Sequence, residues 1–134
     1  MSITGKVLII DDEPHVRKFV SLIVKRLGAT SVFEAGDGEQ GLEIFQAELP
    51  DLVLLDVNMP RMDGVETLRA IMNVRPDALV VMLTSLANRQ TVEECSKLGA
   101  ADYLRKDMPR AEMEAALQHI IDESQQEPEP NPEA

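Results

Sequence analysis

Three segments of the chain are apolar at nearly every position, and two others are shorter or more polar. The apolar segments are Lys6–Ile10, Asp51–Leu55 and Ala78–Leu83. A strand covered by helices on both faces is apolar at consecutive positions, so these segments are predicted to form the centre of a parallel β-sheet. The other two segments, Thr30–Ala35 and Ala101–Leu104, are predicted to be its edge strands.

Apolar residues at helical spacing fill the gaps between the predicted strands. The first helix is predicted to begin near Pro14 and to end at Gly28. Asp37 and Asp63 are each followed three residues later by Gln or Glu, a pattern typical of helix N-termini. Two further helical faces are predicted at Val92–Leu98 and Met113–Ile121.

Strands and helices thus alternate five times along the chain. Such alternation predicts right-handed crossovers and a parallel sheet with helices on both faces. Placing the most apolar strands in the centre gives the order 2-1-3-4-5, which is a flavodoxin-like, doubly wound α/β fold. In this order a ligand is expected at the carboxyl ends of strands 1 and 3, where the direction of winding changes.

Length and composition fit one domain followed by a short tail. The chain has 134 residues, of which 44% are apolar, so residues 1–122 are predicted to form one domain with one core. Residues 123–134 are acidic, rich in proline and without apolar periodicity. We interpret this segment as a disordered tail.

The charge pattern excludes some classes of partner. A net charge of −11 argues against binding to nucleic acid. No stretch approaches the roughly 20 apolar residues of a membrane span, and the N-terminus lacks a signal-peptide pattern. The single cysteine, Cys95, is consistent with a reducing compartment, and we expect a cytoplasmic protein without membrane contact.

Polar residues collect where the predicted strands end. The acids are Asp11 and Asp12 after the first strand and Asp56 after the third, with Asn58 close behind. Strands 1 and 3 are predicted neighbours, so the three carboxylates should lie within a few ångströms of one another. Like charges at that spacing share a proton or bind a cation. An all-oxygen ligand set favours Mg²⁺.

A carboxylate beside Mg²⁺ can act as a nucleophile on a phosphoryl group. Asp56 is the candidate, because the turn that contains Pro60 and Gly64 keeps it at the rim of the sheet. Thr84, after the fourth strand, would donate a hydroxyl hydrogen bond. Lys106, after the fifth, would supply a mobile positive charge, which phosphoryl transfer requires.

Four motifs occur in the order and at the spacing of a known family. They are IIDDEP, LLDVNMPRMDG, LTS and YLRK. Over residues 5–122 the chain resembles a response regulator receiver domain of two-component signalling, of the stand-alone, chemotaxis-regulator type. The resemblance implies a phosphorylation-activated switch that takes its phosphoryl group from a sensor histidine kinase or a phosphotransfer protein.

The same resemblance assigns roles to individual residues. It implies that Asp56 accepts the phosphoryl group and contacts Mg²⁺ together with Asp12 and the backbone carbonyl of Asn58, while Asp11 acts mainly through water. Thr84 and Tyr103 match the switch pair of the family, and Lys106 matches its phosphate-contacting lysine. A downstream protein is expected to bind residues Arg89–Lys97, Tyr103–Arg105 and Arg110–His119.

The chain departs from the family at one position. Asp107 follows Lys106 where the family often has a proline with a cis bond. A cis bond before a residue other than proline costs about 2.5–4 kcal/mol, so we expect a trans bond here.

Three alternatives remain open from the sequence. The protein could be a phosphate sink, or an interaction module that never accepts phosphate. A haloacid dehalogenase-like phosphatase is a remote alternative, because its nucleophile would lie on the first strand. No output domain follows in the sequence, so we expect signalling through protein binding, by a monomer or a phosphorylation-dependent dimer.

Overall fold

The computed structural model describes residues 5–59, 62–85 and 88–125. In these ranges five strands alternate with five helices along the chain. The strands are β1 (Lys6–Ile10), β2 (Ser31–Ala35), β3 (Leu52–Asp56), β4 (Val80–Thr84) and β5 (Asp102–Arg105). The helices are α1 (Pro14–Arg26), α2 (Gly38–Glu48), α3 (Gly64–Val74), α4 (Arg89–Leu98) and α5 (Arg110–Gln125).

The strands form one parallel sheet in the order β2-β1-β3-β4-β5, which confirms the predicted topology. In the register of the sheet, Ile10 pairs with Leu55, and Asp56 pairs with Leu83. The carboxyl ends of β1, β3 and β4 therefore lie side by side. This edge is where the sequence places its acidic residues.

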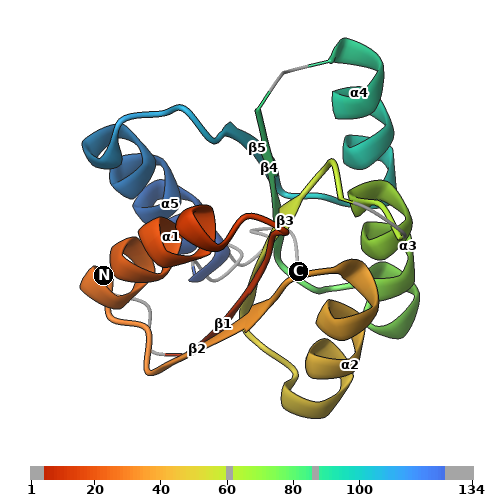
Figure 1. The fold of residues 1–134 in the computed structure, drawn as a ribbon, viewed down its shortest axis with the longest axis horizontal. Helices are drawn as coiled ribbons and strands as arrows, with labels where there is room; N and C mark the ends of the chain where they lie inside the picture. Colours follow the sequence, from red (N-terminus) through yellow and green to blue (C-terminus); the bar gives the residue numbers. More distant parts are fainter. Residues whose placement is uncertain (1–4, 60–61, 86–87, 126–134) are drawn as a thin grey trace, which may run out of the picture.

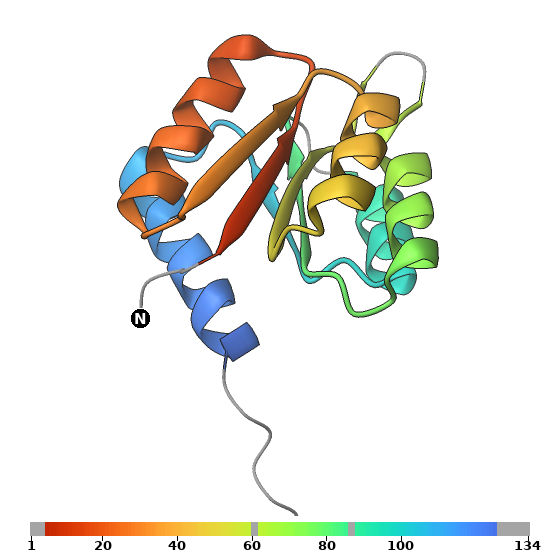
Figure 2. The same ribbon diagram turned by 90° about the horizontal axis from the view of Figure 1, so that it is seen from below.

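Helices cover both faces of the sheet (Figure 1). Helices α1 and α5 lie on one face, and α2, α3 and α4 lie on the other; Figure 2 shows the same two layers from below. Each face has its own apolar cluster, one including Ile9, Ile23 and Leu117, the other including Leu8, Phe45 and Ile71. Because both faces are covered, every residue of β3 and β4 is buried.

The N-termini of two helices confirm the predicted capping pattern. The Asp37 side chain accepts a hydrogen bond from the Gln40 N–H at 2.8 Å, and Asp63 accepts one from the Glu66 N–H at 2.9 Å. Helix α1 begins differently, because its N-cap, Glu13, makes no capping side-chain hydrogen bond and Pro14 occupies the first position. The Glu13 carboxylate is thereby left for other contacts.

Element boundaries differ slightly from the sequence prediction. Strand β3 includes Asp56, because backbone pairing continues past the last apolar residue, and the Val57 N–H still donates to the Leu83 carbonyl at 3.0 Å. Helix α5 runs to Gln125, beyond the predicted domain end at residue 122. Residues 123–125 of the predicted tail are therefore helical, and the rest of the predicted tail lies outside the described residues, as does Pro60 of the predicted turn. Within the described ranges, no helix is long and apolar enough to cross a membrane.

Gly64 begins α3 in close contact with the backbone at the end of β3. A Cβ atom there would lie 2.6 Å from Val57 Cα and would also meet the Asp56 carbonyl. We therefore expect Gly64→Ala to lower the free energy of unfolding by about 2 kcal/mol or more, measured by urea denaturation. Gly36→Ala is the matched control, because its new Cβ would meet only Arg17 Nη1 at 3.6 Å. Equal stability of the two variants would contradict this packing argument.

Candidate functional site

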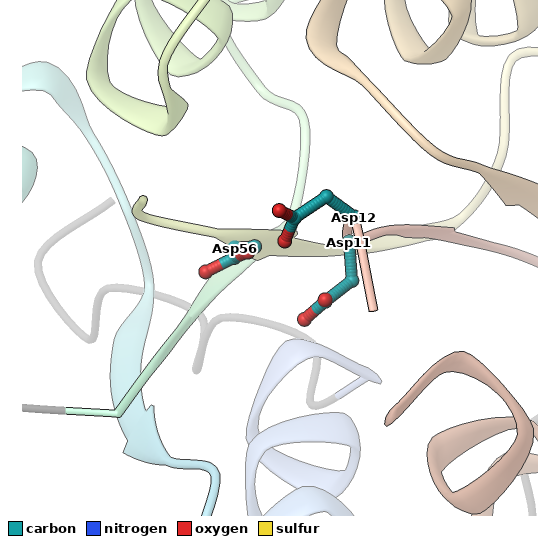
Figure 3. A group of neighbouring side chains, drawn as sticks. All are labelled: Asp11, Asp12 and Asp56. Atoms are coloured by element: carbon teal, nitrogen blue, oxygen red, sulfur yellow. The ribbon is translucent and has the colours of Figure 1, made fainter. Parts of the chain in front are cut away.

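Three aspartates from two neighbouring strands converge at the carboxyl edge of the sheet (Figure 3). Asp11 and Asp12 directly follow β1, and Asp56 ends β3. One carboxylate oxygen from each lies within 4.8 Å of the other two. Asp11 and Asp56 are buried whereas Asp12 is exposed, so the cluster is open to solvent on one side. The sequence prediction that these carboxylates meet is confirmed.

Asp11 is fixed at both its backbone and its side chain. Its N–H donates to the Ala35 carbonyl at 3.0 Å, and its own carbonyl accepts a 2.6 Å hydrogen bond from Arg17 Nη1. Its side-chain Oδ1 accepts from the Glu13 N–H at 2.8 Å. Arg17 and the Glu13 N–H therefore hold Asp11 against the first turn of α1.

Asp56 has one occupied and one unoccupied side-chain oxygen. Oδ1 accepts from the Asn58 N–H at 3.2 Å and lies 3.1 Å from Lys106 Nζ. Oδ2 is buried and has no hydrogen-bond partner among the described residues. A buried carboxylate oxygen without a partner is costly, so it marks a place where another atom is expected to bind.

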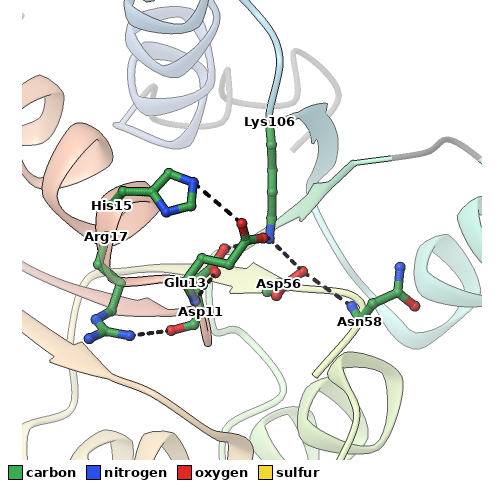
Figure 4. A network of polar contacts seen from close by, with 7 residues as sticks. All are labelled: Asp11, Glu13, His15, Arg17, Asp56, Asn58 and Lys106. Atoms are coloured by element: carbon green, nitrogen blue, oxygen red, sulfur yellow. Dashed lines mark hydrogen bonds and ion pairs between the residues drawn. The ribbon is translucent and has the colours of Figure 1, made fainter. Parts of the chain in front are cut away.

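Lys106 reaches the same point from the loop after β5 (Figure 4). Its Nζ lies 2.8 Å from Asp11 Oδ2, 3.1 Å from Asp56 Oδ1 and 3.1 Å from Glu13 Oε1. Its side chain is only 8% exposed. A single buried ammonium group thus forms ion pairs with three carboxylates.

This arrangement shifts the protonation of the acids. Burial and, after it, the negative charge of Asp11 raise the pKa of Asp56 to about 7, although Lys106 opposes the shift. Burial also raises the pKa of Asp11. For Lys106, burial alone would lower the pKa, but the contacts with its carboxylate partners raise it above the ordinary lysine value. Lys106 therefore offsets only part of the cost of burying Asp11 and Asp56 as carboxylates.

The donor set fits a hard divalent cation. Mg²⁺ takes one or two carboxylates as direct ligands and keeps several waters. The cluster offers three carboxylates, two of them with a buried oxygen that has no hydrogen-bond partner among the described residues, and it is open to solvent at Asp12. Asn58 is placed beside the cluster through its N–H, which donates to Asp56. The predicted contact of its carbonyl with the metal stays a prediction.

Thr84 and Tyr103 lie on neighbouring strands, Thr84 at the carboxyl end of β4 and Tyr103 two residues before the end of β5. Thr84 ends β4 and is buried, and Tyr103 of β5 pairs with Met82, two residues before Thr84. The Tyr103 hydroxyl is buried without a hydrogen-bond partner among the described residues. The ring also lines a cavity of about 170 Å³ together with Val92 and Cys95 of α4. Space for a rearrangement of this ring is therefore present.

Two site residues were missed by the sequence analysis. Glu13 contacts Lys106, and Arg17 holds the Asp11 carbonyl. The motif DDEP contains Glu13, but its position before Pro14 indicated only a helix start. The predicted trans bond before Asp107 is confirmed, since the described residues contain no cis peptide bond. Asp107 instead pairs with Arg105 at 2.9 Å.

Comparison with known proteins shows the family to which the chain belongs. The family model described as "Response regulator receiver domain" matches residues 7–118. The chain therefore belongs to the response regulator receiver domain family of two-component systems. Domains of this family are generally signalling switches without enzymatic activity, and they interact with kinases or phosphotransfer proteins and with downstream targets.

Individual relatives show how much of the chain is shared. A probable chemotaxis protein CheY of Rhizobium etli is 36% identical over 119 residues, covering 87% of this chain and 92% of that protein. The probable C4-dicarboxylate response regulator DctR of Bacillus subtilis is 35% identical over 84% of this chain, but the chain spans only 50% of DctR. Several relatives thus carry additional sequence beyond the shared domain.

Solved structures show the same fold. Chemotaxis protein CheY4 of Vibrio cholerae superimposes with a TM-score of 0.81 at 29% identity, covering 88% of this chain and 99% of that one. CheY in the CheX–CheY–BeF3–Mg complex of Borrelia burgdorferi gives a TM-score of 0.82 at 30% identity, covering 87% and 88%.

Proposed function

We propose that Asp56 accepts a phosphoryl group from a histidine kinase or phosphotransfer protein, and that the phosphorylated domain signals by altered binding to another protein. The observation that carries this proposal is the Asp56 Oδ2 atom, buried without a hydrogen-bond partner beside two carboxylates and a lysine. Family membership supports it. In the phosphate-sink alternative, Asp56 accepts the phosphoryl group in the same way, but the phosphorylated domain binds no downstream target.

In the proposed reaction an Asp56 oxygen forms a bond to phosphorus while the bond from phosphorus to the donor nitrogen breaks. The donor imidazole keeps the electron pair. Lys106 stays within reach of the oxygens of the transferred group, since its Nζ lies 3.1 Å from Asp56 Oδ1. Asp11, Asp12 and Asp56 would hold Mg²⁺, which when bound supplies positive charge for the phosphoryl oxygens.

Direct labelling tests the proposal. The protein is incubated with acetyl phosphate and Mg²⁺, and the intact mass is measured before and after treatment. We expect one added phosphoryl group, dependent on Mg²⁺ and located by peptide mapping to β3. A protein that takes up no phosphoryl group from this donor or from a phosphorylated kinase would instead be an interaction module. Rapid turnover of a small phosphomonoester would favour the phosphatase alternative.

Mg²⁺ binding should depend on Asp12. Asp12→Ala removes a predicted direct ligand and its charge, so we expect Mg²⁺ affinity to fall about tenfold or more in a calorimetric titration. Asp107→Ala is the matched control, because Asp107 is an exposed acid near Lys106 that lies outside the cluster. Equal affinity of Asp12→Ala and the parent would contradict the metal assignment.

Output is proposed to run through Thr84 and Tyr103. Phosphoryl oxygens on Asp56 offer new acceptors to the Thr84 hydroxyl, and its movement would let the Tyr103 ring rotate toward the sheet edge. The surface affected is the α4-β5-α5 face, where β5 is an edge strand of the sheet. A downstream protein, or a second copy of the chain in a phosphorylation-dependent dimer, would bind there.

Thr84→Ala should separate phosphorylation from output. We expect Asp56 to label in this variant, while the increase in partner binding or dimerisation caused by beryllofluoride falls to less than about a third of the parent value. Light scattering or a pull-down from the native cell extract measures that increase. Ser85→Ala is the control, because Ser85 is a neighbouring hydroxyl that is exposed whereas Thr84 is buried. Full phosphorylation-dependent binding in Thr84→Ala would show that the signal takes another route.

A further proposal concerns the compartment. The sole cysteine of the chain, Cys95, is buried and unpaired, which is consistent with the cytoplasm. The net charge of −11 supports partners that are proteins and not nucleic acids.

A further inference from the structure

Glu13 is a third carboxylate at Lys106, and it lies outside the three-aspartate cluster. Its Oε1 is 3.1 Å from Lys106 Nζ, as close as Asp56 Oδ1. Its burial is different, because the Glu13 side chain is 41% exposed whereas those of Asp11 and Asp56 are 0% and 2% exposed. Figure 4 shows Glu13 between Lys106 and His15.

Lys106 is paired with three carboxylates in this state. An ammonium group has three N–H donors, and three carboxylates lie within 3.1 Å of Nζ. A phosphoryl group on Asp56 would add acceptors of higher charge close to the same nitrogen. The phosphoryl oxygens would then compete with the present partners of Lys106.

Of the two partners that remain carboxylates after Asp56 is phosphorylated, Asp11 and Glu13, Glu13 costs less to release. A half-exposed carboxylate regains water when it leaves the lysine, whereas a buried one does not. Its second oxygen also lies 3.3 Å from His15 Nε2, which offers an alternative contact. The backbone need not move, because the Glu13 N–H remains bound to Asp11 Oδ1 at 2.8 Å.

Space for this movement lies next to the residue. A cavity of about 510 Å³ separates α1 from the loop after β5, and Glu13 and Lys106 line its polar side. Val16, Phe19 and Met113 line its apolar side. The Glu13 side chain can therefore turn away from Lys106 without repacking the core.

We propose that Glu13 is a positioning residue that competes with the phosphoryl group for Lys106 and thereby slows phosphorylation. This inference rests on the proposed role of Asp56 as phosphoryl acceptor. In the unphosphorylated state Glu13 takes up one contact of Lys106, whose Nζ also lies 3.1 Å from Asp56 Oδ1, and it adds a negative charge near an anionic reactant. When a phosphoryl group occupies the site, Glu13 is released from Lys106.

Glu13→Gln tests the proposal because it removes the charge and keeps the shape. At saturating Mg²⁺ we expect the second-order rate constant for labelling by acetyl phosphate to rise about 3- to 10-fold, the scale of one unit charge a few ångströms away in a wet site. The midpoint of a beryllofluoride titration, followed by backbone amide NMR, should fall by a similar factor. A side chain with a merely structural role would not improve anion binding when altered. Glu13→Ala should change both quantities in the same direction.

Glu114→Gln is the matched control, because it removes the same charge from a glutamate paired with Arg26, outside the site. The control should leave the rate and the midpoint within about twofold of the parent. If the Glu13 variants label Asp56 no faster than Glu114→Gln and bind beryllofluoride no better, the inference is wrong while the proposed function stands. If the parent itself does not label at Asp56, the proposed function is what fails.

Discussion

Replacing Asp56 by Asn is expected to abolish phosphorylation. The amide keeps the size of the side chain and can keep the hydrogen bond from the Asn58 N–H, which lies 3.2 Å from Asp56 Oδ1. The substitution replaces the carboxylate by a neutral amide, which is a much poorer nucleophile toward phosphorus. Intact mass after treatment with acetyl phosphate and Mg²⁺ should then equal the untreated mass.

The control for this loss is Asp77→Asn. Asp77 is an exposed aspartate paired with Arg75 at 3.2 Å, so the variant changes the same chemical group at a place without other acids. It should label as fully as the parent. If Asp56→Asn still labels, the acceptor is another group, and Asp11 and Asp12 are the next residues to replace.

The second large effect concerns pH and stability. The metal-free protein is expected to be more stable at about pH 5 than at about pH 7.5, by roughly 1–3 kcal/mol. The cause is the pKa of Asp56, which burial and the negative charge of Asp11 raise from 3.8 to about 7 in the folded state. At a pH between the unfolded pKa of 3.8 and the folded pKa of about 7, Asp56 holds a proton in the folded state that it has lost in the unfolded state. The stabilisation is fully present below the unfolded value of 3.8 and is lost as the pH rises to about 7.

Urea denaturation in the presence of a chelator measures this difference. Asp56→Asn is the internal control, because it carries no titrating group at this position and should show a much smaller difference between the two pH values. Excess Mg²⁺ should restore stability at the higher pH, since it binds the ionised cluster of the folded state. Higher stability of the metal-free parent at about pH 7.5 would show that Lys106 alone is sufficient to keep Asp56 ionised.

The order of the elements could be predicted from the sequence because it depends on local patterns. Consecutive apolar residues in Lys6–Ile10 identify a strand covered on both faces, and Asp37 and Asp63 identify helix starts by capping chemistry. The strand order followed from the same patterns, since the less apolar strands must lie at the edges. The proximity of Asp11, Asp12 and Asp56 then followed from the parallel sheet, because the carboxyl ends of all its strands lie at the same edge.

Strand ends were predicted less well than strand centres. Asp56 belongs to β3 by backbone pairing, although its side chain is polar. Hydropathy records only side chains, whereas the ladder is made by N–H and C=O groups that every residue except proline carries in full. The end of α5 at Gln125 was missed for a similar reason, because a helix can continue past its last apolar contact.

The three aspartates and the lysine of the site were predicted from the sequence, whereas the way in which they share charge depends on the tertiary structure. The sequence placed Lys106 at the acidic edge without showing how many acids share its charge. Folding brings Glu13 to Lys106 across 93 positions of the chain, and it leaves Oδ2 of Asp56 buried without a hydrogen-bond partner among the described residues. Such facts depend on the rotamers and burial of side chains packed from α1, β3 and the loop after β5. No local pattern encodes them, because burial and charge pairing arise from the summed positions of segments that are distant in the sequence.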